Sequence, residues 1–148
     1  LCFTAEEAWQ CYVKDKKDSI HLKTIPVSNS EWKDDDLNNK WKRIRYIRSL
    51  VLSEIEEVRN KNIIKSSLQA SVEITLGQED SNLFKNLIAA DLFITSEVNF
   101  LIKEVQTPIV RISSSLGNKC NRCWKILAEV KEDGICKRCS DVIKKHYS

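Results

Sequence analysis

The clearest hydrophobic pattern in the chain runs through residues 34–60. Apolar side chains recur there at spacings of three and four, which is typical of a helix that buries one face. They are Leu37, Trp41, Ile44, Ile47, Val51, Ile55 and Val58. Acidic residues 34–36 stand at its start, where the helix dipole favours negative charge. The pattern predicts a long helix whose apolar stripe belongs to a core.

A period of two follows this helical period. Residues 68–76 alternate apolar and polar, which predicts a half-buried strand that Gly77 ends. Apolar residues at helical spacing over 83–88 predict a short helix. The apolar runs at 92–98 and 109–112 predict two more strands. Strand, helix and strand in this order predict a small α/β layer.

Residues 5–14 carry a shorter helical pattern near the start of the chain. One helix of this length cannot bury an apolar face alone, so we expect it to belong to a bundle. We assign Trp9 and Trp41 to the core. Cys2 and Cys11 lie far from the other cysteines and are predicted to be core thiols of the first helix.

The other four cysteines form two C-x₂-C pairs, Cys120 with Cys123 and Cys136 with Cys139. Each pair sets two thiolates on one tight turn, and two such turns can close a tetrahedron of four sulfurs. Gly134, after Asp133, supplies a turn that folds the second pair back on the first. This pattern predicts one bound Zn²⁺ ion, which favours thiolate ligands.

Three interpretations of the cysteine set are open. Structural zinc matches the spacing best. Disulfides are the second interpretation, and nothing in the sequence is typical of secretion. Catalytic zinc is the third, but four cysteines leave no coordination position for water. We therefore expect the metal to supply folding free energy, and the segment around it to be largely unfolded without metal.

Composition limits the class of protein to which the chain can belong. Its 148 residues are 42% hydrophobic, with three glycines and two prolines, which suits a core without long flexible linkers. No apolar run approaches membrane-spanning length, so we expect no membrane partner. Cysteine use fits a reducing compartment, and we expect a cytoplasmic monomer. The sequence has no methionine, and we interpret it as part of a longer polypeptide. We find no phosphate-binding glycine loop and no Ser/His/Asp arrangement.

Basic charge gathers in two places. Residues 119–148 hold eight Lys or Arg against four Asp or Glu, although the whole chain has a net charge of only +3. Within the long predicted helix, five cations fall within residues 40–48. Each group is either a solvated surface or a site for a phosphate-bearing partner.

Trp124, beside the first cysteine pair, is either a cover over the zinc sulfurs or a ring on which an unpaired base stacks. The residues that we predict to contact RNA are Lys42, Arg45, Arg48, Arg122, Trp124, Lys125, Lys137 and Arg138.

Three segments together resemble the C-terminal region of the bacterial, zinc-containing type of isoleucyl-tRNA synthetase. The first is Phe-Thr-Ala-Glu-Glu-Ala-Trp at 3–9, which is similar to a motif of the family's helical anticodon-binding domain. The second runs from Trp41 through Ile44, Arg45, Val51, Glu54 and Arg59 into residues 64–72. The third is the pair of cysteine motifs with Trp124. Lys65 and Gln69 depart from the family's usual Gly and Glu.

The resemblance implies an α+β fold in three parts. These are a helical segment of an anticodon-binding bundle (1–62), a small α/β subdomain (63–115) and a Cys₄ zinc-knuckle module (116–148). It implies that the chain holds the anticodon arm of tRNA(Ile) and is not itself catalytic. An upstream catalytic core of the same polypeptide would use ATP and Mg²⁺ to charge the tRNA with isoleucine.

Two other functions fit the zinc motif alone. One is a DNA-binding zinc module of the kind found in repair glycosylases, and the other is a zinc-stabilised protein-interaction domain. A glycosylase would also need a helix-two-turn-helix and an N-terminal catalytic group, and neither is evident. The helical and α/β segments before the cysteines favour tRNA binding.

Overall fold

The structure, a computed structural model, describes residues 1–13, 17–132 and 134–147. It divides into two compact units, Leu1–Asp35 and Asp36–Ser148, and each is described by itself. Among the described residues, no helix is both long enough and apolar enough to span a membrane.

The first unit consists of α1 (Cys2–Tyr12) and two short 3₁₀ helices, η1 (Ile20–Leu22) and η2 (Ser30–Trp32). The Glu6 carboxylate joins α1 to η1, because its Oε2 accepts hydrogen bonds from Ser19 Oγ at 2.8 Å and from the Ile20 amide at 3.1 Å. The predicted helix is therefore present, although it begins earlier, and Lys14 at its predicted end lies outside the described residues.

The prediction that Cys2 and Cys11 are core thiols is wrong for this unit. Both thiols are exposed, since α1 buries no residue completely within residues 1–13 and 17–35. Trp9 is half-buried and lies against Tyr12, with 5.9 Å between the ring centroids. Its assignment to a core is met only in part.

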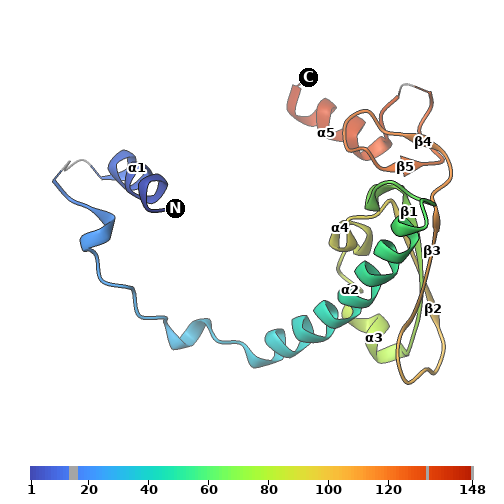
Figure 1. Cartoon of the computed structure of the whole chain (residues 1–148), viewed down its shortest axis with the longest axis horizontal. Coiled ribbons are helices and arrows are strands. Elements are labelled where there is room, and N and C mark those ends of the chain that lie inside the picture. Colours follow the sequence, from blue (N-terminus) through green and yellow to red (C-terminus); the bar gives the residue numbers. More distant parts are fainter. Residues whose placement is uncertain (14–16, 133, 148) are drawn as a thin grey trace. The chain divides into compact units, whose positions relative to one another are not determined.

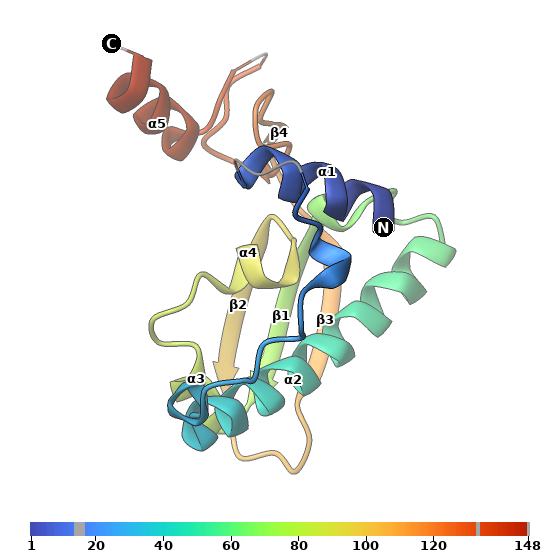
Figure 2. The same cartoon turned by 90° about the vertical axis from the view of Figure 1, so that its left-hand side faces the viewer.

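The second unit is organised around α2 (Asp35–Asn60), which confirms the long helix. Its stripe of Ile44, Ile47, Val51 and Ile55 is buried against one face of a three-stranded sheet (Figures 1 and 2). Trp41 packs at the edge of the same cluster, as predicted. The stripe forms because residues three and four apart share one face of a helix.

The sheet has the order β2-β1-β3, with β1 at Ala70–Leu76, β2 at Glu97–Ile102 and β3 at Ile109–Ser114. Strand β1 is parallel to β2 and antiparallel to β3. Every second residue of β1 is buried, which confirms the strand predicted at 68–76 from residue 70 onward. Residues 67–69 before the strand form a 3₁₀ turn, η3 (Ser67–Gln69).

The connection from β1 to β2 differs from the prediction in its boundaries. It contains α3 (Gln78–Leu83) and α4 (Ala89–Phe93). The helix predicted at 83–88 is wrong beyond Leu83, because residues 84–88 form the turn between these two helices. The strand predicted at 92–98 is helical at 92–93 and begins only at Glu97. Phe93 is fully buried from this helical turn, and Ile94 then takes a left-handed conformation with φ of 58°. A short apolar run does not distinguish a buried helical turn from a strand, which explains the error.

The C-terminal residues form a small module made of β4 (Asn118–Lys119), β5 (Ile126–Leu127) and α5 (Lys137–Tyr147). Its core consists of Val130 and three buried cysteines and is separate from the cluster under α2. Glu129 accepts a hydrogen bond from the Lys137 amide at 3.0 Å, which satisfies one of the free N–H groups where α5 begins.

Candidate metal centre and nucleic-acid interface

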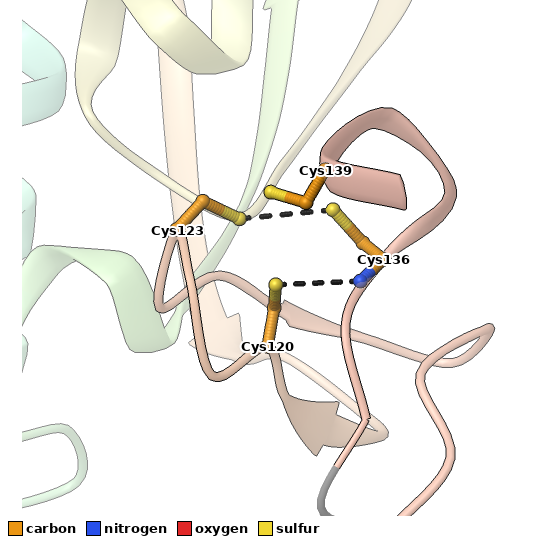
Figure 3. Close-up of side chains that lie close together, drawn as sticks. All are labelled: Cys120, Cys123, Cys136 and Cys139. Atoms are coloured by element: carbon orange, nitrogen blue, oxygen red, sulfur yellow. Dashed lines mark hydrogen bonds between the residues drawn. The ribbon is translucent and has the colours of Figure 1, made fainter. Parts of the chain in front are cut away.

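The four C-terminal cysteines converge, as the spacing predicts. Their Sγ atoms all lie within 4.8 Å of one another, and Figure 3 shows the side chains pointing toward a common centre. Cys120 and Cys123 come from the turn after β4, whereas Cys136 and Cys139 come from the start of α5. All four are free thiols, so the structure does not support the disulfide interpretation.

The sulfur geometry fits a tetrahedral metal ion. The Sγ atoms of Cys123 and Cys136 are 3.8 Å apart. Zn–S bonds of about 2.3 Å at tetrahedral angles separate sulfurs by about 3.8 Å. Cys120, Cys136 and Cys139 are buried and Cys123 is half-buried. Four sulfurs without an oxygen or nitrogen ligand suit a soft or borderline metal, so this set could hold one metal ion.

Backbone hydrogen bonds shape the first cysteine turn. The Trp124 amide donates to the Cys120 carbonyl at 2.9 Å, and the Cys120 amide donates to the Lys125 carbonyl at 2.9 Å. The Cys136 amide donates to Cys120 Sγ at 3.3 Å (Figure 3). These bonds aim N–H dipoles and sulfur atoms in the arrangement that a bound metal requires.

The thiols differ in acidity. Burial disfavours ionisation of Cys120, but hydrogen bonds from backbone N–H groups outweigh it and lower the pKa to about 6. Burial raises the pKa of Cys136 to about 12 and also raises the pKa of Cys123. A cation at the centre would offset this cost of burying negative sulfur.

Trp124 does not cover the sulfurs. The residue is 60% exposed, so it is not the buried cover that this interpretation expected. It follows Cys123 directly in the turn, and its φ of 66° is unusual for a bulky residue. The Lys119 ammonium lies 5.2 Å from the ring centroid, a distance typical of a cation–π contact.

A pocket of about 440 Å³ lies beside this ring. Trp124, Lys119 and Ile126 line it from the module, and Ile94 and the segment 66–69 line it from the body of the unit. Lys119 was not among the predicted contacts. Its position directly before Cys120 is the one signal that the sequence contains for it.

The predicted RNA contacts fall into two groups. Arg122, Lys137 and Arg138 are exposed on the module together with Trp124. Lys42 and Arg45 are exposed on the first half of α2. This part of α2 lies beside α3, since Arg43 pairs with Asp80 of α3 at 2.6 Å. Figures 1 and 2 place α3 and the module at opposite ends of the sheet.

The remaining two predicted contacts, Arg48 and Lys125, have internal partners. Arg48 Nε donates to the Leu92 carbonyl of α4 at 3.0 Å. Lys125 Nζ donates to Asp91 Oδ1 at 2.5 Å, and its side chain is only 15% exposed. The Lys125 hydrogen bond lowers the pKa of Asp91 against the opposing effect of burial, and the charge of Arg138 lowers it further.

Comparison with known proteins gives the class. Residues 1–74 match the family described as the anticodon-binding domain of tRNA ligase, and the chain belongs to that family. The chain is 41% identical to the isoleucine–tRNA ligase of Gluconobacter oxydans (strain 621H), over 97% of this chain and 15% of that protein.

Further relatives carry the same name. The chain is 34% identical to the isoleucine–tRNA ligase of Zymomonas mobilis subsp. mobilis, over 97% of this chain and 15% of that protein. It is 30% identical to that of Desulforamulus reducens, over 100% of this chain and 18% of that protein. The chain therefore spans less than a fifth of the length of these relatives, and the matching part is C-terminal.

Proposed function

We propose that this chain is the tRNA-binding C-terminal part of an isoleucine–tRNA ligase and holds the anticodon arm of tRNA(Ile). The catalytic core, upstream in the same polypeptide, uses ATP and Mg²⁺ to attach isoleucine. The observation that carries the proposal is the exposed Trp124 ring, flanked by Lys119 on a metal-binding turn, in a chain of the anticodon-binding family. The protein acts as a cytoplasmic monomer.

The metal in this proposal is one structural Zn²⁺ ion, held by Cys120, Cys123, Cys136 and Cys139. When bound, it supplies the free energy that folds the module, because four sulfur ligands leave no position at which water could react. The chain's own residues do the rest. The hydrogen bond from the Trp124 amide to the Cys120 carbonyl holds the aromatic residue at the metal-binding turn.

Base recognition falls to Trp124 in this proposal. Proteins that read single-stranded RNA commonly stack splayed bases on aromatic rings. Trp124 is exposed and lines a pocket whose other walls include Ser66, Leu68 and Gln69. Serine and glutamine can hydrogen-bond the edge of a base that enters this pocket.

Phosphate binding falls to the exposed cations. Arg122, Lys137 and Arg138 surround the metal-binding turns, and Lys42 and Arg45 form a second group on α2. Cations that neutralise phosphates release counterions, so binding weakens as salt rises. Two groups at opposite ends of the sheet suit an extended RNA arm better than a compact ligand.

Replacement of Trp124 tests the proposal. Loss of one base–aromatic stack costs about 1–3 kcal/mol, so we expect Trp124→Ala to weaken tRNA(Ile) binding by roughly 5- to 150-fold. Trp124→Phe retains a ring and should recover most of the affinity. Zinc content and thermal unfolding of both variants report whether the module remains folded.

Leu116→Ala is the matched control, because Leu116 is 81% exposed in the loop before β4 and is not aromatic. It should bind tRNA(Ile) as the unchanged chain does. Equal affinity of the Trp124→Ala chain, with normal zinc content, would contradict base stacking at this residue.

A further inference from the structure

Helix α4 (Ala89–Phe93) lies between α2 and the metal-binding module and is bonded to both. Arg48 of α2 donates to the Leu92 carbonyl, and Asp91 accepts from Lys125 of the module. Lys125 is only two residues beyond the metal ligand Cys123 in the chain. The ion pair is largely shielded on its cationic side, since 15% of the Lys125 side chain is exposed.

Ser96 makes a second connection a few residues further on. Its Oγ donates to the Leu68 carbonyl at 2.6 Å and accepts from the Ile126 amide at 2.7 Å. Ser96 is 4% exposed, so water does not readily replace either bond. Leu68 lies in η3 and Ile126 in β5, so one hydroxyl joins the sheet body to the module.

The same short stretch closes the metal-binding turn. The Lys125 carbonyl accepts from the Cys120 amide at 2.9 Å, so the residue that pairs with Asp91 also completes the turn between two ligands. Trp124 sits between Cys123 and Lys125 in sequence. Its backbone is therefore flanked by a metal ligand on one side and by the residue that pairs with Asp91 on the other.

We propose that Asp91, Ser96 and Lys125 are positioning residues that couple metal binding to the placement of Trp124 on the body of the protein. The four cysteines, if they held a metal ion, would order the first cysteine turn, which presents Lys125 to Asp91 and the Ile126 amide to Ser96. Without metal the module would unfold, and the pocket would lose the wall formed by Lys119, Trp124 and Ile126. The consequence for RNA binding rests on the function proposed above, whereas the coupling itself does not.

Coupling of this kind is reciprocal. If metal binding favours docking by some factor, then docking favours metal binding by the same factor. A substitution that weakens the contacts of Asp91 and Ser96 with the module must therefore also weaken metal affinity. This holds even though none of the three positioning residues is a ligand. Couplings between sites commonly amount to factors of about 5 to 150, and we expect roughly tenfold here.

Zinc affinity of the full 148-residue chain, measured by competition with a chromophoric chelator, tests the proposal. We expect Asp91→Asn to weaken zinc binding roughly tenfold. Ser96→Ala should weaken it in the same direction. The sign is decisive for Asp91, because loss of a carboxylate near a site of net charge about −2 would by electrostatics alone leave zinc affinity unchanged or strengthen it.

Glu73→Gln is the matched control. Glu73 pairs with Arg111 at 3.7 Å between β1 and β3 and belongs to neither the module nor α4. The Glu73→Gln chain should bind zinc with the same affinity as the unchanged chain. Asp91→Asn combined with Lys125→Met should lose no more than the larger of the two single losses, since both remove one interaction.

Hydrogen exchange of the unchanged chain shows which part of the second unit depends on zinc, whereas the variants test the coupling itself. Removal of zinc should expose the Ile126 amide to exchange, while the amides of α2 around Ile47 stay protected. Unchanged or tighter zinc binding in Asp91→Asn, or fully additive losses in the double variant, would overturn the coupling. If the variants weaken zinc binding as expected but the chain does not bind tRNA, the coupling is supported and the proposed function is contradicted.

Discussion

Gly117 and Gly77 form a natural pair for comparison at the scale of single residues. Gly117 has a φ of 114°, a conformation open mainly to glycine. A Cβ there would also overlap the Leu127 carbonyl of β5. A Cβ on Gly77 would meet no atom within 4 Å.

We therefore expect Gly117→Ala to destabilise the module by more than about 1 kcal/mol, through both backbone strain and collision. Gly77→Ala should change stability by less than about 1 kcal/mol. Thermal unfolding of the zinc-loaded variants checks both. Equal stability of the two would show that the β4–β5 contact does not constrain Gly117.

The sequence shows which cysteines come together more readily than it shows which cations have partners inside the fold. The four cysteines were predicted from spacing alone, because C-x₂-C turns impose their own local geometry. Arg48 and Lys125 look like any other exposed cations in the sequence. Their partners, the Leu92 carbonyl and Asp91, are far away in the chain, so only the fold reveals that both are internally bonded.

Helix α2 shows how a single element organises the second unit. Ile44, Ile47 and Val51 are 0% exposed and pack against Val72 and Ile74 of β1. A helix this long repeats its apolar spacing many times, so its limits could be predicted to within one residue. The short connection between β1 and β2 could not, because a few apolar residues satisfy a helical turn and a strand equally well.

Truncation of Ile47 tests this role of α2. Ile47→Ala should lower the free energy of unfolding by about 2–5 kcal/mol, since it removes buried methyl groups and leaves a cavity. Ser53→Ala, at an exposed position of the same helix, should change it by less than about 0.5 kcal/mol. Urea denaturation followed by circular dichroism measures both. A loss below about 1 kcal/mol for Ile47→Ala would remove α2 from the centre of the core.

At the scale of the whole molecule, the second unit has two hydrophobic cores of different kinds. One consists of aliphatic and aromatic side chains from α2, the sheet and α4. The other contains Val130 and Leu127 among the cysteines and has little apolar surface to bury. The first core is expected to persist without metal, whereas the second depends on it.

Cys136→Ser should accordingly reduce bound zinc and unfold residues 119–148, while α2 keeps its protection. Amide hydrogen exchange, together with metal analysis, measures the two effects separately. Removal of zinc from the unchanged chain by a chelator should give the same pattern. Full zinc content with an unchanged exchange pattern would contradict the metal assignment.

A helical segment, an α/β layer and a cysteine segment could be expected from the sequence, because the hydrophobic period and the composition change along it. The way in which the module attaches to the body was not predictable. It rests on Ser96 and Asp91, a lone hydroxyl and a lone carboxylate that no motif marks. The division of the chain at residues 62 and 115 stays a prediction.

Binding of the zinc-loaded chain to labelled tRNA(Ile) across a salt series is the measurement to make first. A tRNA with a different anticodon and a DNA duplex serve as competitors. We predict preferential binding of tRNA(Ile), with an affinity that falls as salt rises because phosphate contacts release counterions. Equal binding of all three nucleic acids, or no binding at all, would contradict an anticodon-arm role for this chain.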